Sequence, residues 1–562
     1  MSLLKLLCTW PVLCSALLLT RLSAYSAAPP AGTWKLTVYQ SSSELDLCLV
    51  KIIAEDNQRW RATVIARGVP DLDLVAEKLS ITGRKLVLTL NLAGNSYTVT
   101  ATMPEQPAVN ILYGVFGRRP DMLLPVILER TDQQELDPKK SVRQSPANKA
   151  FVEAVGTANQ ERQRELLRTL LKQHGENPIA IFATVQLITL LADIEGQTKE
   201  IQGLAQDALH LAAKYGPALE GNAAWRIGEA LLNSSKNQDL APTYLERAIS
   251  LFSAEAPASF RARLHKILAK AYRVSGQAAK AQALMAKIEA LERQADDEYR
   301  RSVPPFPVHP VQPRKEPGRA VVLELFTGTQ CPPCVAADVA FDAIGRTYSP
   351  TQVILLQYHL HIPRADPLTN PDTIKRSEFY QVQGTPTALI NGKPTSGLGG
   401  PMQYAESRYK TLLKLINAHL QAEPPCHIDL QVRKQDHHLD IEATVSGYKN
   451  MPEKARLLFV LVEKEVRYPA PNEIRFHHHV VRAIPGGHEG FALEKDKTRQ
   501  SVRVDLVNLE KDLRDYLNRY ARETPFPDDE QPLELRHLRV IALIQDLATR
   551  EILHAALADV PD

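Results

Sequence analysis

Two cysteines separated by two prolines are the residues of this chain best suited to chemistry. Cys331 and Cys334 stand in the run Cys-Pro-Pro-Cys, and a cysteine thiolate is the nucleophile in disulfide exchange. An apolar run at 320–326 precedes the pair, and apolar residues at helical spacing follow it from Val335 onwards. The pair is therefore expected where a buried strand ends and a helix begins. There, unpaired N–H groups and the positive end of the helix dipole would favour a thiolate on Cys331.

Closely spaced cysteines also occur in zinc half-sites and in permanent bridges. A zinc site would need a second Cys or His pair at suitable spacing, and none is evident, so we expect no metal and no cofactor. His359 and His361 alternate near the same edge and could aid proton transfer or, with the cysteines, bind copper. Ordinary hydrogen-bonded histidines are the alternative. The three histidines at 477–479 are adjacent on an expected strand, so their side chains should not converge on one ion.

Further elements are expected to position the pair. A second buried strand is predicted at 352–358, a polar helix at 372–380, a third strand at 388–391 and a closing helix at 403–420. The run Gly-Thr-Pro-Thr begins at residue 384, directly before the third strand. These elements bring two segments distant in sequence to one edge of a sheet.

This order of elements, with Cys-Pro-Pro-Cys opening the first helix and Gly-Thr-Pro before the third strand, resembles the thioredoxin fold over 319–422. The resemblance implies that Cys331 is the attacking cysteine and Cys334 the resolving one. It implies that Pro386 is a cis-proline beside them, and that Thr385 presents backbone groups to a substrate peptide. An activity on protein cysteines follows as an expectation.

Two further residues near the pair are candidates for the site. Gln330 stands where thioredoxins usually have Trp, and we expect it to contact the substrate. The resemblance also implies a buried acid below the disulfide that accepts a proton from the resolving cysteine. Glu324 is the candidate, although its loop to Cys331 is one residue longer than an ungapped match. A strand-end glutamate that faces water is the alternative.

The start of the chain has the pattern of a signal peptide. Residues 1–26 contain an early lysine, a largely apolar run at 6–19 and small residues at the end. The apolar run is shorter than the ~20 residues that span a bilayer. We therefore expect export to the periplasm or cell envelope with no stable membrane span. An uncleaved anchor is the alternative.

The remaining segments predict a multidomain α+β protein. Residues 27–140 show eight short alternating segments, typical of an all-β barrel or sandwich. Residues 145–300 have helical spacing that resembles a tetratricopeptide (TPR) array, whose groove could hold a protein partner. The proline-rich stretch 301–318 predicts a stiff linker, open to proteolysis. Residues 426–562 return to strand patterns and suggest an immunoglobulin-like β-sandwich.

Charge and cysteine usage limit the function further. The formal net charge of +3 falls to +1 without the two basic residues of the leader, which gives no electrostatic case for nucleic acid or anionic lipid as the main partner. Cys48 alternates with leucines and is expected to be a buried thiol, while Cys426 is either free or paired with it.

The sequence therefore predicts an exported thiol–disulfide oxidoreductase acting on protein cysteines, with a possible redox partner protein. One alternative is a non-catalytic binding or scaffold protein of the envelope, in which Cys-Pro-Pro-Cys is a permanent bridge. The other is a copper-handling protein.

Overall fold

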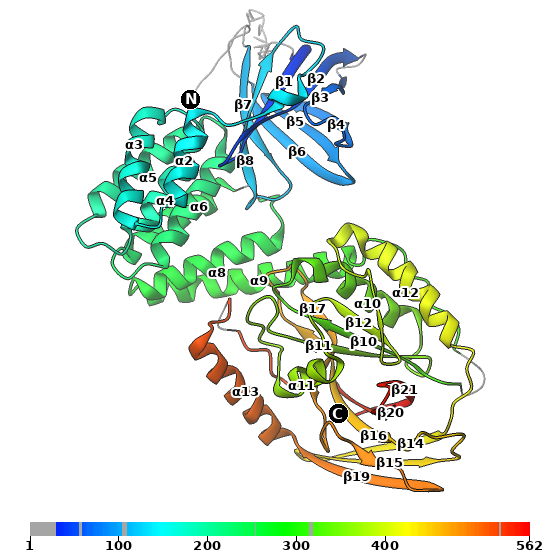
Figure 1. Cartoon of the computed structure of the whole chain (residues 1–562). Helices are drawn as coiled ribbons and strands as arrows, with labels where there is room; N and C mark the ends of the chain where they lie inside the picture. Colours follow the sequence, from blue (N-terminus) through cyan, green and yellow to red (C-terminus); the bar gives the residue numbers. More distant parts are fainter. Residues whose placement is uncertain are drawn as a thin grey trace, which may run out of the picture. The chain divides into compact units, whose positions relative to one another are not determined.

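The computed structural model describes residues 30–55, 59–103, 110–252, 254–313, 318–527 and 530–561 (Figure 1). The chain contains both helices and strands, as the sequence predicts, and it divides into two compact units, 1–292 and 293–562. The expected signal peptide lies outside the described residues. Within the described ranges, no helix combines the length and the apolar character needed to cross a membrane.

The first unit begins with the eight antiparallel strands that the alternating pattern predicts. They lie in the order β3-β2-β1-β8-β7-β6-β5-β4, with a short β9 (Val142–Arg143) beside β2. Inward-facing residues of all eight strands share one core, because alternate side chains point to the same face. Cys48 lies in this core as a free thiol, and burial raises its pKa to about 12. The strands are β1 (Gly32–Tyr39), β2 (Glu44–Glu55), β3 (Arg59–Arg67), β4 (Leu74–Thr82), β5 (Lys85–Leu92), β6 (Asn95–Thr102), β7 (Ile111–Gly117) and β8 (Leu123–Arg130).

Helices complete the first unit. One helical core contains Trp225 on α6 and Tyr272 on α8, two positions of the TPR-like spacing. Val115 of β7 packs with Ile181 and Tyr215 in a further core, so the strands and helices belong to one compact unit. The helices are α1 (Pro138–Ser141), α2 (Pro146–Gly156), α3 (Gln160–His174), α4 (Ile179–Leu191), α5 (Thr198–Ala213), α6 (Pro217–Leu232), η2 (Gln238–Leu240), α7 (Ala241–Leu251), α8 (Ala258–Val274) and the first part of α9 (Ala278–Ser302), whose residues from 293 onwards belong to the second unit.

The second unit is built on a nine-stranded sheet with the order β13-β12-β10-β11-β17-β16-β20-β21, and β18 (Phe491–Ala492) pairs with β16. β10 is parallel to β11 and antiparallel to β12. Helices α10 and α12 pack on one face of the sheet, and α11 packs on the other (Figure 1). The strands are β10 (Val321–Thr327), β11 (Val353–His359), β12 (Thr387–Ile390), β13 (Lys393–Thr395), β16 (Ala455–Arg467), β17 (Phe476–Ala483), β20 (Leu538–Asp546) and β21 (Ile552–Asp559). The helices are η3 (Pro332–Cys334), α10 (Val335–Thr347), α11 (Pro371–Tyr380), η4 (Met402–Tyr404) and α12 (Ala405–His419).

The C-terminal strands differ from the separate sandwich expected for 426–562. β17 pairs in parallel with β11 through Gln357 and Val480, so β16, β17, β20 and β21 extend the sheet that carries the cysteine pair. Every residue of β20 is buried, as in a strand covered on both faces. β14 (His427–Gln435), β15 (His438–Ser446) and β19 (Lys497–Asp505) form a second sheet, which is followed by helix α13 (Leu506–Glu523). Residues of β14 and β15 share one core with residues of β16 and β20, so two packed sheets are present, but one of them continues into the sheet of the cysteine pair.

The proline-rich stretch 301–318, expected to be a stiff linker open to proteolysis, is packed against neighbouring helices over part of its length. Its first residues end α9, and Phe306 is buried, with its ring stacked 5.3 Å from that of Tyr409 on α12. The N–H of Val311 donates to the carbonyl of Thr347 at 2.8 Å. The stretch is irregular, as proline requires, but 303–311 is held against α10 and α12.

Replacing this aromatic anchor tests the correction. Phe306→Ala is expected to lower the free energy of unfolding by about 3 kcal/mol, because it removes a buried ring and leaves a cavity. Chemical denaturation of the full chain would measure the loss, and limited proteolysis would show new cuts at 303–313. Val311→Ala, at an exposed side chain, should change little. An unchanged denaturation midpoint for the Phe306 variant would restore the free-linker interpretation.

Candidate functional site

The cysteine pair forms a disulfide where the sequence predicts it, at the start of a helix. Cys331 and Cys334 are bonded with their Cα atoms 5.3 Å apart, and η3 leads directly into α10. The expected unpaired N–H groups are not found there. The N–H of Val335 donates to Pro332, and that of Ala336 donates to the carbonyl of Gly400 at 2.9 Å. Only the helix dipole and side-chain donors remain to stabilise a thiolate on Cys331.

Thr385 and Pro386 lie beside the disulfide, as expected. The Thr385–Pro386 peptide bond is cis. The hydroxyl of Thr385 lies 3.4 Å from Sγ of Cys331, and the Thr385 carbonyl oxygen lies 3.6 Å from the same sulfur. The same hydroxyl lies 3.2 Å from the carbonyl of Ile362, so it can donate either to that oxygen or to a Cys331 thiolate, and a reduced Cys331 can donate to the Thr385 carbonyl.

The side-chain amide of Gln330 makes a contact within the chain, and its expected contact with a substrate stays a prediction. Its Nε2 donates to the carbonyl of Ala365 at 2.7 Å. Next to it, the N–H of Thr329 donates to Oδ2 of Asp366 at 2.7 Å. Together these bonds fasten the turn before Cys331 to the segment that follows β11. Gln330 therefore positions the turn.

Glu324 is buried, which excludes the water-facing alternative, but it lies on the wrong face to serve the disulfide. Its neighbours Leu323 and Leu325 pack with α10, so the alternation of β10 turns Glu324 toward α11. There its Oε1 pairs with Arg376 at 2.8 Å, and it also accepts from two tyrosine hydroxyls, those of Tyr358 and Tyr380. The loop from Glu324 to Cys331 is one residue longer than an ungapped match to the thioredoxin fold, and this extra residue agrees with the position of Glu324 on the opposite face of β10.

The buried acid on the face of the cysteines is Asp338, which the sequence reasoning missed. It stands on α10 four residues after Cys334, and residues at i and i+4 lie above one another on one helix face. Burial raises the pKa of Asp338 to about 7. Gln357 donates to its Oδ1 at 3.1 Å. An acid in an apolar helix, one turn beyond the second cysteine, was the signal available in the sequence.

The two histidines expected on one strand face have separate environments. β11 ends at His359, which is buried and shares hydrogen bonds with Asp366 at 3.0 Å and Gln357 at 3.3 Å. His361 lies beyond the strand, where its ring stacks 3.6 Å from that of Tyr520, and burial lowers its pKa to about 4. Across the described residues, no group of His, Cys, Asp or Glu is arranged to hold a metal ion, which includes 477–479. Both side chains fit the alternative of ordinary hydrogen-bonded histidines.

The disulfide is covered within the second unit. Cys331 is 1% exposed and Cys334 is 0% exposed. Asn472, in the loop between β16 and β17, donates its N–H to the carbonyl of Thr329 at 3.1 Å and its amide to that of Gly328 at 3.3 Å. The C-terminal segment therefore closes over the turn that leads to the cysteines. Cys426 is a free buried thiol, whose pKa burial raises to about 11.

Comparisons with known proteins are sparse. No family model and no curated protein matches the chain. Among solved structures, HBP35 of Porphyromonas gingivalis matches with a TM-score of 0.31 and 16% sequence identity, over 44% of this chain and 77% of that chain. A likeness at this TM-score carries no argument about fold or function.

The buried carboxyl of Asp338 should make stability depend on pH. Its pKa is about 7 in the native state against an ordinary value of 3.8, so between these values the native state binds more protons than the unfolded chain. The contribution of Asp338 to the free energy of unfolding should therefore fall as pH rises from about 4 to about 7. Asp338→Asn lacks this contribution, so its free energy of unfolding relative to the parent should rise over this range and exceed the parent at pH 8 by up to about 4 kcal/mol.

Denaturation of the oxidised protein at pH 5 and pH 8 would measure the effect. Asp512→Asn, at an exposed position of α13, is the matched control and should follow the parent at both pH values. If the Asp338 variant keeps the parent's pH dependence, the carboxyl is ionised in the native state and the argument fails.

Proposed function

We propose that the chain is a thiol–disulfide oxidoreductase in which Cys331 and Cys334 exchange disulfides with protein cysteines. The observation that carries the proposal is the placement of Cys331 Sγ within 3.6 Å of the Thr385 carbonyl and 3.4 Å of its hydroxyl, beside a cis-proline. A nucleophilic sulfur next to a backbone carbonyl suits a site that aligns a peptide for exchange.

The strand order supports a thioredoxin-like assignment for 319–422. β10 lies between its parallel partner β11 and its antiparallel partner β12, with β13 at the edge. The cysteine pair follows the central strand, and α10 and α12 share one face opposite α11. This agrees with the order of elements that the resemblance implies. The sheet also continues into β17, β16, β20 and β21, which the resemblance to the thioredoxin fold does not imply.

The chemistry requires two successive exchanges. In the reducing direction, the Cys331 thiolate attacks one sulfur of a client disulfide, forms a mixed disulfide and releases the other client cysteine as a thiolate. The Cys334 thiolate then attacks Sγ of Cys331, which forms the Cys331–Cys334 disulfide and releases the second client thiolate. Two electrons pass to the client, and the oxidising direction is the reverse path.

Asp338 is the group suited to accept the proton that the resolving cysteine, Cys334, must lose. Cys334 must lose a proton to become nucleophilic, and it has no contact with bulk water. A carboxyl one helical turn away, with a pKa raised to about 7 by burial, can accept that proton near neutral pH. Gln357 donates to Asp338, and its side-chain oxygen shares a hydrogen bond with His359.

A second candidate function is favoured by the burial of the pair. A disulfide that is 1% and 0% exposed at its two residues suits a permanent bridge in a non-catalytic binding protein of the envelope. For the catalytic proposal, the same burial requires that the loop around Asn472 move before a protein client can reach Cys331. The two functions differ in the reduction potential that they need.

Equilibration of the full chain with glutathione buffers, followed by alkylation and mass spectrometry, would give that potential. The oxidoreductase proposal expects a value above about −270 mV, whereas a permanent structural bridge lies below about −300 mV. A value in the lower range would favour the binding protein. Export to the cell envelope belongs to the proposal, because residues 1–26 have the pattern of a signal peptide.

A further inference from the structure

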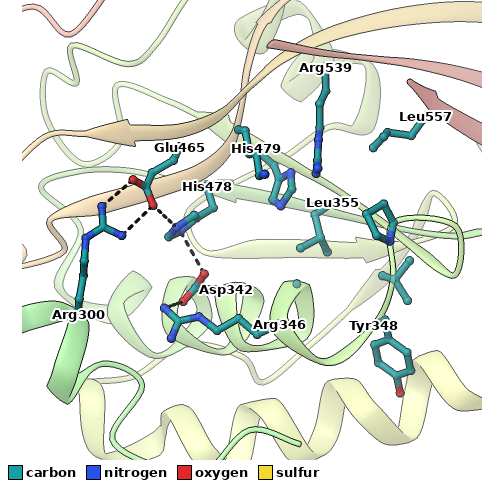
Figure 2. Close-up of a pocket in the computed structure, with 14 residues that line it drawn as sticks. Arg300, Asp342, Arg346, Tyr348, Leu355, Glu465, His478, His479, Arg539 and Leu557 are labelled. Atoms are coloured by element: carbon teal, nitrogen blue, oxygen red, sulfur yellow. Dashed lines mark hydrogen bonds and ion pairs between the residues drawn. The ribbon is translucent and has the colours of Figure 1, made fainter. Parts of the chain in front are cut away.

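A pocket of about 580 Å³ lies in the second unit, away from the cysteines, between α10, the start of β11 and the strands β16 and β17 (Figure 2). β11 and β17 pair only through Gln357 and Val480, so the two strands separate on one side of this bridge. His479, the residue before Val480, has a φ of +56°, which interrupts the regular path of β17. The pocket occupies this split in the sheet.

Glycine on the facing helix keeps the pocket open. A Cβ at Gly345 of α10 would lie 2.9 Å from Cδ1 of Leu355 and 3.7 Å from Nε2 of His479. Leu355 and Val353 of β11 and Leu557 of β21 supply an apolar wall. The pocket therefore offers an apolar surface that a hydrocarbon or aromatic body could cover.

The acidic residues of the pocket are already paired. His478 joins them, since its Nδ1 lies 3.2 Å from Asp342 and its Nε2 lies 3.2 Å from Glu465. Asp342 also pairs with Arg346 at 2.6 Å, and Glu465 pairs with Arg300 at 2.7 Å (Figure 2). These contacts neutralise the acidic side of the pocket.

Two further cations line the pocket, Lys464 and Arg539. Lys464 has no acidic partner in the part of the chain that the structure describes. Arg539 pairs at 2.6 Å with Asp559, whose side chain is 71% exposed and therefore well solvated. An anion in the pocket would meet the buried Arg539 and the exposed Lys464.

His479 provides a buried polar atom without a partner. Within the described residues its Nδ1 is buried and has no hydrogen-bond partner, although buried nitrogen atoms normally have one. Figure 2 places its ring between Arg539 and Leu355, among the side chains that line the pocket. Burial lowers the pKa of His479 to about 3, so the ring is neutral and can donate one hydrogen bond to a ligand.

We propose that this pocket binds a small amphipathic carboxylate. The carboxylate lies at Lys464 and Arg539 and accepts a hydrogen bond from His479, and the apolar body lies against Leu355 and Leu557. Figure 2 shows Leu557 beside Arg539 and Leu355 beside His479, so a ligand whose carboxylate meets Arg539 and His479 can lay its apolar body against the two leucines. The site is independent of the redox chemistry.

Calorimetric titration of the full chain with octanoate tests the proposal. We expect saturable binding of one octanoate, at least tenfold weaker binding of 1-octanol, which lacks the charge, and no binding of inorganic phosphate, which lacks the chain. Lys464→Gln should weaken octanoate binding at least tenfold, and Gly345→Leu should abolish it by filling the pocket. Lys497→Gln, at an exposed position of β19, is the matched control and should bind as the parent does.

The outcomes separate this site from the proposed redox function. A variant with Cys331→Ser and Cys334→Ser should bind octanoate unchanged, whether or not the pair is catalytic. Equal binding of octanoate and 1-octanol, tight binding of phosphate alone, or unchanged affinity in Lys464→Gln would each overturn the proposal. The Lys464 side chain is exposed, so its variant should remain folded and decisive even if Gly345→Leu misfolds.

Discussion

Cys334→Ser is expected to accumulate a covalent complex with client proteins through Cys331, while Cys331→Ser accumulates none and loses turnover by at least a thousandfold. The difference arises because only Cys331 lies beside Thr385, whose hydroxyl at 3.4 Å can donate to the thiolate and whose carbonyl can hold a client. Without Cys334, no second thiolate resolves the mixed disulfide. Non-reducing electrophoresis and mass spectrometry of the trapped species would identify the bonded cysteine.

Two variants serve as controls for this experiment. Cys48→Ser and Cys426→Ser replace free thiols that are buried in cores and whose raised pKa values keep them protonated, so both should retain activity. Alkylation of the reduced protein across pH should show faster reaction at Cys331 than at Cys334. Equal reactivity of the two, with no trapped complex, would instead support the permanent bridge.

Arg376→Met should give the largest loss of stability. The Arg376 guanidinium is buried, pairs with Glu324 at 2.8 Å and donates to Gln545 at 2.7 Å, so it joins α11 to β10 and β20. Removing one partner of a buried pair leaves the other charge unpaired, which typically costs 3–5 kcal/mol, so we expect a loss of about 4 kcal/mol. Chemical denaturation of the full chain would measure it.

The double variant shows whether the ion pair itself matters. Arg376→Met combined with Glu324→Leu removes both charges and should be less destabilised than the sum of the two single variants. Arg503→Met, at an exposed pair with Asp440 between β19 and β15, is the matched control and should not change the unfolding midpoint measurably. Additive losses in the double variant would show that the two side chains do not interact.

The features that the sequence predicts correctly depend on local patterns. The apolar run before Cys331, the helical spacing after Cys334 and the position of Pro386 before a strand all lie within short windows, and the structure confirms the disulfide and the cis bond. The eight N-terminal strands are predicted for the same reason, because a period of two is visible within each strand.

The features that the sequence does not reveal depend on pairing between distant segments. Gln357 and Val480 are brought together by the sheet, and no local signal indicates that β17 will lie beside β11. Asn472 reaches the turn before the cysteines for the same reason. The face on which Glu324 lies depends on one residue of register, and the extra residue in the loop to Cys331 was the one local signal of that shift.

The pairing of β17 with β11 also has a consequence for synthesis of the protein, because β11 is made long before its partner strand. Gln357 and Val480 are 123 positions apart in the chain, so at about 5–20 residues per second a ribosome needs roughly 6–25 s to add the partner strand. During that interval the buried apolar strand β11 has a free edge, which is a template for pairing with other chains. The last third of the chain therefore protects β11 from aggregation, because β17 pairs with its free edge once that part of the chain has been synthesised.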